Sequence, residues 1–495
     1  MSWGWIAAAG GLITLAHAPS FFHRLDDSDE AIYSSIAALM NAGGALYSDG
    51  GVDNKPPGIF WVYAATFRIF GVYQMTAVHV VALLFIGATC WLLFLIGRRL
   101  SSSRAGLLAA VLYGVLTGQG NPGLQAANAE VLMMLPLAAS VLVMLGRRWM
   151  WSGALLVAAI AFKQVAAANL LLVPAAIVLL EPERARLRAA VSFGAGLVAA
   201  MLVGAAILEL TSSLTGFWHW SVASLYGFAA MNWKPDQLWF RVRDSLPYFV
   251  GGTAVIWVAA IAFASRWRGL RAAERVVVVW LAASAVGSVA GGHLFYHYFV
   301  QVMGPLALVG GIAIDRALDS PEREHGKHLL DRRWIAAAIV VGVAVPTAAW
   351  GVYDLSADPL TYNVAAPVPQ HAQVAAYIKA NSRPADRIFV WGDSPNLYVE
   401  SDRLMASRFP GFLRGFARGS ALPPNNWDTA PEVWPELQAD LERNPPALIV
   451  DTAAAGWSDF AMYPMSNYPV LQDLVTTNYH LAAVVDGVAI YTRSS

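Results

Sequence analysis

Long apolar runs dominate this chain and restrict the folds that it can adopt. A transmembrane helix needs about 20 predominantly apolar residues to cross the roughly 30 Å hydrocarbon core of a bilayer. Nine runs can serve as single crossings, near residues 3–20, 76–96, 105–119, 131–146, 189–209, 246–264, 275–291, 298–314 and 334–352. The 495 residues are 57% hydrophobic and only 13% charged, whereas about a quarter of the residues in globular chains are charged. This composition argues strongly against a soluble enzyme of this size.

The apolar stretch 150–180 is too long for one crossing and is interrupted by Lys163 and Gln164. Arginine-rich segments flank it on both sides, at 147–148 and 184–188, so both ends should lie on the same side of the membrane. The stretch is therefore predicted to form two short helices that turn near Lys163, which gives about eleven spans. Because an unpaired lysine at membrane depth costs a few kcal/mol, Lys163 should pair with a carboxylate or a phosphate, or reach the surface.

Lys and Arg residues are distributed unevenly between the two sets of loops. Seventeen fall in loops on one side and six in loops on the other, with nine more in the C-terminal tail. Since cytoplasmic loops carry the excess of positive charge, the N-terminus is predicted to be cytoplasmic and the C-terminal domain external, in a multi-pass protein of the plasma (inner) membrane. The formal net charge of +0 argues against nucleic acid as a partner. The single cysteine, Cys90, allows neither a disulfide nor a cysteine-based metal site within one chain.

Hydrophobicity ends near Leu355, and the remaining residues have a globular composition. Helical periodicity covers 370–381, strand patterns cover 387–391 and 447–451, and 481–492 is typical of a hairpin that turns at Asp486-Gly487. The predicted fold class is therefore mainly α: a polytopic membrane module over residues 1–355, followed by a small external α/β domain over 356–495.

The first external loop, 21–75, holds the densest group of polar residues outside the tail. Its carboxylates are Asp26, Asp27, Asp29 and Glu30, with Asp49 and Asp53 further on. Apolar residues then recur at helical spacing, which predicts an amphipathic helix lying on the membrane surface and capped by Ser28 or Asp29: Ile32, Ile36, Leu39 and Met40. A second helix is expected to start at Asn54-Lys55-Pro56-Pro57, with Lys55 at its positive end.

These carboxylates and Lys55 suit a reaction between a lipid-borne phosphate and a nucleophile that arrives from water. A carboxylate can take the proton of an attacking hydroxyl, and a lysine or a metal ion can neutralise a departing phosphate. The alternative is that the cluster is a solvated charged face with a helix cap. His293 and His297, one helical turn apart, could chelate a metal ion together or could belong to an aromatic belt at the membrane interface.

Several short motifs, taken in order, resemble those of the polyprenyl-phosphate-sugar-dependent membrane glycosyltransferases of the GT-C fold, which include protein O-mannosyltransferases and aminoarabinose transferases. The motifs are Asp29-Glu30-x-x-Tyr33, Leu46-Tyr47-x-Asp49, Lys55-Pro-Pro-Gly58, Asn128-Ala-Glu130, Phe162-Lys163-Gln164, and the tract from His293 to Gln301 with Pro305 beyond. The resemblance covers about residues 1–350.

The resemblance implies a role for each matching position. Asp29, with Glu30 beside it, would be the catalytic base that activates the acceptor hydroxyl. Lys55 would contact the donor phosphate, with Arg24, Arg241 and Arg243 as further cations. The cavity for acceptor and donor would be lined by Glu130, Lys163, Gln164, Tyr296 and His297. Some members of the family bind a divalent metal ion, for which the candidate ligands here are Glu130, His293 and His297.

The chain also departs from the family pattern. Ala31 and Ile32 occupy the turn in which aminoarabinose transferases commonly carry an arginine, and Asn54 stands where an acidic metal ligand can occur. Both changes argue against a lipid A transferase and against bound zinc. Asp26 and Asp27 lie close enough to Asp29 to be alternative bases.

The sequence thus predicts an inverting glycosyltransferase at the external face of the membrane. Its partners would be a polyprenyl-phosphate sugar donor, membrane lipid, and a glycan, lipid or protein that offers the acceptor hydroxyl. Two alternatives remain open: a polysaccharide polymerase or ligase with a lipid-diphosphate donor, and a lipid or solute transporter. A transporter would be expected to bury its ionisable groups at the membrane midplane between repeated halves, whereas the polar clusters here are assigned to external loops.

Overall fold

The computed structural model describes residues 3–119, 125–223, 235–292, 294–319, 332–356, 371–411 and 433–494. The chain divides into two compact units. The first contains residues 1–22, 79–204 and 235–356, and the second contains 23–78, 205–234 and 357–495. Helices α4 (Met75–Leu100) and α9 (Glu183–Thr211) each run from one unit into the other.

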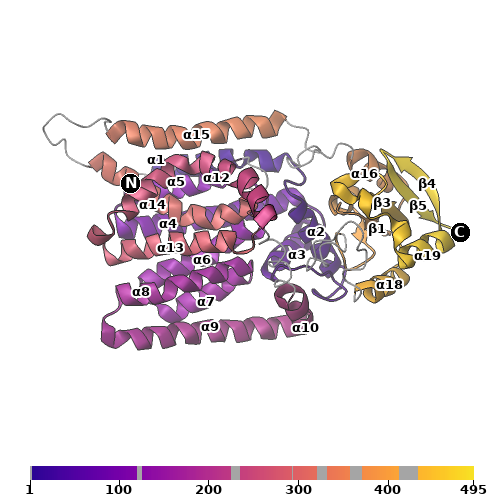
Figure 1. The fold of residues 1–495 in the computed structure, drawn as a ribbon, viewed down its shortest axis with the longest axis horizontal. Coiled ribbons are helices and arrows are strands. Elements are labelled where there is room, and N and C mark those ends of the chain that lie inside the picture. The colour runs from indigo at the N-terminus through magenta and orange to yellow at the C-terminus, as the bar shows by residue number, and fades with distance from the viewer. Residues whose placement is uncertain are drawn as a thin grey trace. The chain divides into compact units, whose positions relative to one another are not determined.

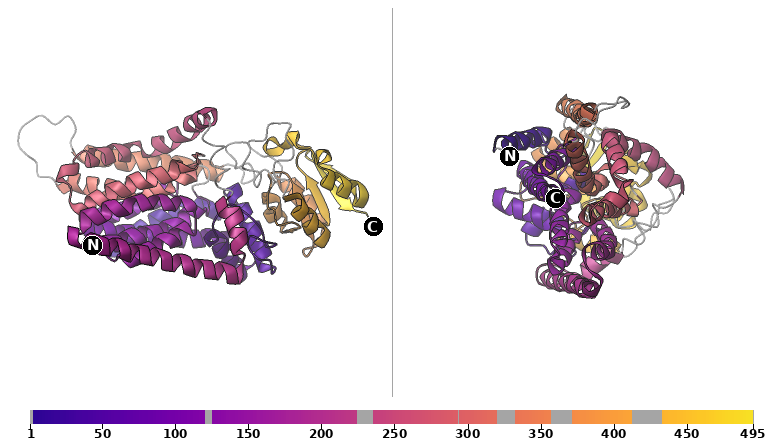
Figure 2. Two further views of the ribbon diagram at one scale, coloured as in Figure 1. Left: turned by 60° about the horizontal axis from the view of Figure 1, so that its bottom comes forward. Right: turned by 90° about the vertical axis from the view of Figure 1, so that its left-hand side faces the viewer.

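The first unit is a bundle of apolar helices that run roughly parallel or antiparallel to one another (Figures 1 and 2). Besides α4 and α9, its α-helices are α1 (Trp3–Ala16), α5 (Ser103–Leu116), α6 (Ala129–Leu145), α7 (Trp149–Ile160), α8 (Leu172–Leu180), α12 (Pro235–Ala264), α13 (Ala272–Ala290), α14 (Val300–Asp319) and α15 (Arg332–Ser356). Shorter turns connect them: η1 (Ala18–Phe21), η2 (Gln164–Leu171), η4 (Trp267–Gly269) and η5 (Tyr296–Phe299).

A helix covers each of the predicted spans, and the stretch 150–180 forms α7 and α8 with η2 between them, as the sequence predicts. Four helical segments among the described residues are long and apolar enough to cross a membrane: Met75–Leu100, Glu183–Thr211, Ala272–Ala290 and Tyr296–Leu318. Other apolar segments found among the described residues, such as Ser103–Leu116 and Ala129–Leu145, are shorter, so the total of eleven spans stays a prediction.

Helix α14 is the centre of the first unit. The most apolar part of the segment Tyr296–Leu318, which includes most of α14, is 94% buried. The helix packs against α5, α6, α12, α13 and α15. At Gly311 an added Cβ would lie 2.7 Å from the backbone nitrogen of Ala109, so the absence of a side chain permits the close approach of α5. Near the end of α14 the buried carboxylate of Asp315 accepts hydrogen bonds from Arg104 (2.6 Å) and Ser102 (2.7 Å), which hold the start of α5 in place.

The second unit brings the first external loop together with the C-terminal residues. The loop contributes α2 (Ser28–Asn41) and α3 (Gly58–Phe70), and the segment after α9 contributes α10 (Leu214–Phe217) and the π-helical turn η3 (Trp218–Ala223). The apolar face of α2 is covered by protein: Ile36 and Leu39 are buried, and α3 packs against this helix. Ile32, Ile36 and Leu39, which were predicted to rest on the membrane surface, therefore form part of the unit's own core, and Met40 is half-buried.

The C-terminal part of the second unit is built on a five-stranded sheet in the order β2-β1-β3-β5-β4 (Figure 1). Strands β2 (Leu404–Met405), β1 (Arg387–Trp391) and β3 (Leu448–Asp451) are parallel, while β5 (Val488–Arg493) runs antiparallel to both β3 and β4 (Tyr479–Val485). The helices here are α16 (His371–Ala380), α17 (Asn396–Ser401), α18 (Val433–Arg443) and α19 (Pro469–Asn478), with the turns η7 (Trp457–Met462) and η8 (Met465–Asn467). The predicted helix, strands and hairpin of the tail are all present, and the two-residue strand β2 was not predicted. The division at residue 355 stays a prediction.

Candidate functional site

The second unit places Lys55 beside Asp29, as the proposed roles require. The ammonium nitrogen of Lys55 lies 3.3 Å from Asp29 Oδ2 and 3.8 Å from Asp53 Oδ1. The hydroxyl of Tyr33, one turn along α2 from Asp29, donates a hydrogen bond of 3.0 Å to the same Asp29 oxygen. Lys55 is buried, whereas the side chain of Asp29 is 20% exposed. The site thus combines an accessible carboxylate with a fixed positive charge.

The backbone around Lys55 is held by hydrogen bonds from three directions. The amide of Lys55 donates to Asp53 Oδ1 (2.9 Å), and its carbonyl accepts from the hydroxyl of Tyr47 (2.7 Å). The hydroxyl of Ser221, in η3, donates to the carbonyl of Asn54 (3.2 Å). Burial and then the negative charge of Asp53 hold the pKa of Tyr47 well above its usual value, so this hydroxyl keeps its proton and remains a donor. The lysine therefore extends from a fixed backbone.

Helix α3 begins later than predicted. Its first residue is Gly58, with Pro57 at the N-cap position, so both prolines precede the helix. Lys55 accordingly lies in a bend before α3 and is not part of its first turn. The hydrogen bonds around Lys55 explain this difference, because they use the backbone groups of residues 54 and 55 outside any helix.

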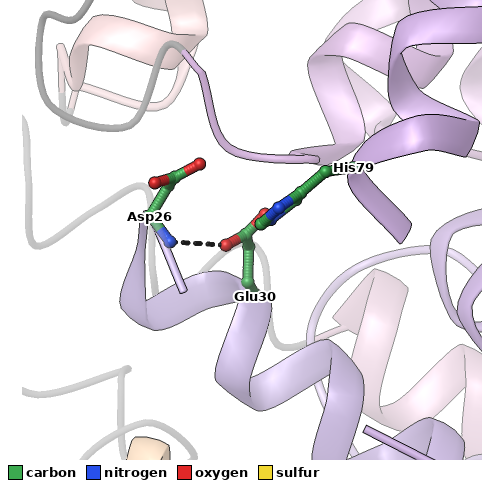
Figure 3. Close-up of side chains that lie close together, drawn as sticks. All are labelled: Asp26, Glu30 and His79. Atoms are coloured by element: carbon green, nitrogen blue, oxygen red, sulfur yellow. Dashed lines mark hydrogen bonds between the residues drawn. The ribbon is translucent and has the colours of Figure 1, made fainter. Parts of the chain in front are cut away.

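The other carboxylates of the loop form the start of α2. Asp27 is the N-cap, and its side chain accepts a hydrogen bond from the amide of Asp29, so the predicted cap at Ser28 or Asp29 was wrong. Figure 3 shows the neighbouring interaction, in which Glu30 Oε2 accepts a hydrogen bond of 2.7 Å from the amide of Asp26. Since Glu30 is fully buried, it suits a structural role at the helix start better than a catalytic one.

Asp26 and Glu30 also belong to a group that could hold a metal ion. Together with His79 they offer one ligand atom each, all within 4.8 Å of one another (Figure 3). His79 lies one turn into α4, and this continuous helix begins at Met75, whose sulfur accepts a hydrogen bond from Ser34 of α2. Two carboxylates and an imidazole are a ligand set that divalent transition metals accept. This group differs from the predicted metal candidates.

A second cluster lies within the first unit. Lys163, just before η2, forms an ion pair with Glu130 Oε1 at the start of α6, as the expectation of a buried partner for this lysine requires. His297 Nε2 lies 3.8 Å from the same Glu130 oxygen, and the Lys163 ammonium lies 3.8 Å from the centre of the Tyr298 ring. Both contacts involve Oε1, and Glu130 Oε2 is buried without a hydrogen-bond partner among the described residues, so a metal ion held by Glu130 and His297 stays a prediction.

The remaining predicted residues have other surroundings. Arg24 pairs with Asp402, a residue of the C-terminal part of the second unit. Gln164 and Tyr296 lie partly exposed in η2 and η5, and Arg243 is exposed on α12. His293 and the side chain of Arg241 lie outside the described part of the structure. The roles of these residues at the site stay predictions.

Sequence reasoning assigned no role to Tyr33, Tyr47 or Ser221. The first lies four residues after Asp29 on a predicted helix, so helical spacing was a usable signal for its hydrogen bond. The contact of Ser221 with Asn54 joins segments 167 residues apart, and no local pattern indicates it.

Comparison with known proteins identifies the fold. A family model described as dolichyl-phosphate-mannose-protein mannosyltransferase matches residues 54–208, which include Lys55, Glu130 and Lys163. ArnT from Cupriavidus metallidurans, bound to undecaprenyl phosphate, is similar over 100% of this chain and 99% of its own, with 17% identity and a TM-score of 0.59. The oligosaccharyltransferase AglB from Archaeoglobus fulgidus, in complex with an inhibitory peptide and a dolichol-phosphate, is similar over 100% of this chain and 75% of its own, with 12% identity and a TM-score of 0.53.

An Archaeoglobus fulgidus oligosaccharyltransferase in complex with Zn and sulfate is similar over 99% of this chain and 73% of its own, with 13% identity and a TM-score of 0.51. No curated protein matches the chain. The predicted resemblance to the GT-C membrane glycosyltransferases is confirmed by the family model and by this shared fold.

Proposed function

We propose that this protein is an inverting glycosyltransferase that moves a sugar from a polyprenyl-phosphate donor to an acceptor hydroxyl at the external face of the membrane. The observation that carries the proposal is the contact of Lys55 with Asp29, 3.3 Å apart, in a chain of GT-C fold. The undecaprenyl phosphate bound to ArnT and the dolichol-phosphate bound to AglB support a lipid phosphate as the donor's leaving group. The acceptor peptide tethered through a disulfide bond in another structure of an Archaeoglobus fulgidus oligosaccharyltransferase supports a separate acceptor molecule as the second substrate.

In the proposed reaction Asp29 takes the proton of the acceptor hydroxyl, whose oxygen attacks the anomeric carbon of the sugar. The bond from that carbon to the phosphate oxygen breaks as the new glycosidic bond forms, and the polyprenyl phosphate leaves with the electron pair. The Lys55 ammonium neutralises the charge that develops on the phosphate. A single displacement inverts the anomeric configuration, whereas retention would require a second carboxylate placed as a nucleophile.

Lys55 can contact the donor phosphate and a carboxylate at the same time. An ammonium group carries three donors, so a donor phosphate can bind to Lys55 while the lysine keeps a contact with Asp29 or Asp53. The partial exposure of Asp29 supports access by an acceptor hydroxyl. Tyr33 then orients the carboxylate through its hydrogen bond. If the protein requires a divalent metal ion, Asp26, Glu30 and His79 are residues that could hold it, and a bound ion would supply further positive charge to neutralise phosphate.

The proposed orientation places the N-terminus in the cytoplasm and the first loop and C-terminal residues outside. Glu130, Lys163, Gln164, Tyr296 and His297 are proposed to line the part of the cavity that receives donor or acceptor. The buried ion pair of Glu130 with Lys163 supports this assignment, because polar groups within apolar helices are costly and commonly mark functional sites.

The test is sugar transfer by the purified protein in detergent, with a panel of polyprenyl-phosphate sugars and a membrane extract as the source of acceptor. We expect one or a few donors to release polyprenyl phosphate and to give a product of inverted anomeric configuration. A product of retained configuration would contradict the mechanism. Inactivity with every monophosphate donor, together with activity on a lipid-diphosphate donor, would favour the polymerase or ligase instead.

A further inference from the structure

The backbone that carries Lys55 is attached to the C-terminal part of the second unit. The amide of Val52, three residues before Lys55, donates a hydrogen bond of 3.1 Å to the carbonyl of Arg408. The hydroxyl of Tyr73, beyond α3, donates to the carbonyl of Arg403 at 3.1 Å. Residues 403–408 follow α17 and include β2, so this short segment contacts the first external loop on both sides of α3.

Arg408 is itself fixed by Asp440 of α18. Asp440 accepts hydrogen bonds from the backbone amide of Arg408 (2.9 Å), from Nε (2.8 Å) and from Nη2 (2.9 Å). Both oxygens of the carboxylate are used, in the bidentate geometry that only an arginine can supply. Asp440 is buried, and Leu437 and Leu441 hold its helix in the core. The Asp440 carboxylate therefore fixes both the guanidinium and the backbone amide of Arg408.

Val52 is connected to the ammonium of Lys55 through Asp53. Val52 precedes Asp53, whose carboxylate accepts the amide of Lys55 and lies 3.8 Å from its Nζ. Phe409, which follows Arg408, packs its ring against Trp220 of η3, with ring centres 6.1 Å apart. The Lys55 segment is thus attached both to η3, through Ser221 and Asn54, and to Arg408, through Val52.

We propose that Arg408 and Asp440 are positioning residues for Lys55, so that the C-terminal part of the protein sets the site that binds the donor phosphate. This inference rests on the proposed function of Lys55. It assigns to the C-terminal residues a role in donor binding that acts through the Arg408 carbonyl and the Val52 amide, without any contact between those residues and substrate. The raised pKa of Arg408, caused first by its hydrogen bond to Asp440, agrees with a guanidinium that stays charged under all working conditions.

The test compares Arg408→Gln with the matched control Arg443→Gln. Arg443 also lies near Asp440 (3.7 Å), but its side chain is 54% exposed, so the control removes one arginine charge from the same carboxylate. Arg408→Lys is the second variant, because it keeps the positive charge and loses the bidentate hydrogen bonding to Asp440. It remains informative if Arg408→Gln does not fold. Hydrogen exchange is measured on a peptide covering residues 50–56, and donor KM and kcat are measured separately.

We expect Arg408→Gln and Arg408→Lys to speed exchange of the 50–56 peptide by about ten-fold and to raise the donor KM by about ten-fold, with a smaller change in kcat. Arg443→Gln should stay within about two-fold of wild type in both measurements. Unchanged exchange and unchanged KM in a folded Arg408 variant would overturn the proposal. Equal loss of kcat and of thermal stability, with unchanged KM, would also overturn it and would leave only a structural role.

The two readouts separate this inference from the proposed function. Hydrogen exchange needs no substrate, so it reports the attachment of Val52 to Arg408 whatever the reaction is. If wild type transfers no sugar although the exchange result is as expected, the proposed function fails and the structural coupling stands. If wild type is active and exchange does not change in the Arg408 variants, the positioning role alone is refuted.

Discussion

Replacing Lys163 with methionine removes the ammonium group that lies on the buried carboxylate of Glu130. The side chains are 5% and 0% exposed, so the variant leaves a negative charge without water and without this partner. Breaking a buried ion pair by removing one partner typically costs about 3–5 kcal/mol. We therefore expect Lys163→Met to lower the free energy of unfolding by about this amount, and Glu130→Gln/Lys163→Met to recover more than half of it, because no charge is then left unpaired.

The assay is denaturation in mixed micelles, followed by tryptophan fluorescence, with Arg147→Met as the control. Arg147 pairs with Glu181 at 3.9 Å, but its side chain is 59% exposed, so its loss should cost less than about 1 kcal/mol. Sugar transfer is measured on the same variants. If the pair lines the donor or acceptor cavity, the double variant regains stability without regaining activity. A single variant as stable as wild type would refute the reasoning, and full activity in the double variant would show that the pair is structural only.

Three further predictions concern the second unit. Lys55→Met should lower kcat/KM by about 10²–10³-fold because it removes the charge facing the departing phosphate, while Lys379→Met, which breaks an exposed pair with Asp402, should change it less than about two-fold. Asp27→Ala should destabilise the protein by about 1 kcal/mol through loss of the α2 cap, as measured by chemical denaturation, and an unchanged midpoint would contradict this. Burial raises the pKa of Asp451 to about 6, so the folded state keeps a proton that the unfolded chain has lost, and stability falls as pH rises from about 4 to 6. Asp451→Asn should therefore be more stable than wild type above pH 6, by up to about 3 kcal/mol, and no such gain in thermal unfolding would contradict the assignment.

The helical architecture was predictable because it depends on local patterns. Apolar length located the spans, and the interruption at Lys163 located the break between α7 and α8. The strands were predictable from their patterns of apolar residues, and the hairpin was predictable from the turn-forming pair Asp486-Gly487. The sequence predicted that Lys163 has a carboxylate or phosphate partner, because an unpaired lysine at membrane depth costs free energy. It could not predict that the partner is Glu130.

The exact start of α2 and the surroundings of the loop could not be predicted. Asp27, Ser28 and Asp29 are all good cap residues in succession, so composition cannot choose among them. The attachment of Arg24 to Asp402 and of Val52 to Arg408 joins residues more than 350 positions apart. Such contacts depend on the tertiary fold, and the sequence carries no local periodicity that indicates them.

The central claim is that Asp29 is the base, and the most direct test compares Asp29→Asn with Asp27→Asn in the release of polyprenyl phosphate from the preferred donor. Asparagine caps a helix as well as aspartate does, so Asp27→Asn should fold and keep activity within about two-fold of wild type. Asp29→Asn removes the proton acceptor and the negative charge beside Lys55, and it should lower kcat by about 10²–10⁴-fold while donor binding persists. Full activity in Asp29→Asn, or an equal loss in Asp27→Asn with its fold intact, would contradict the account.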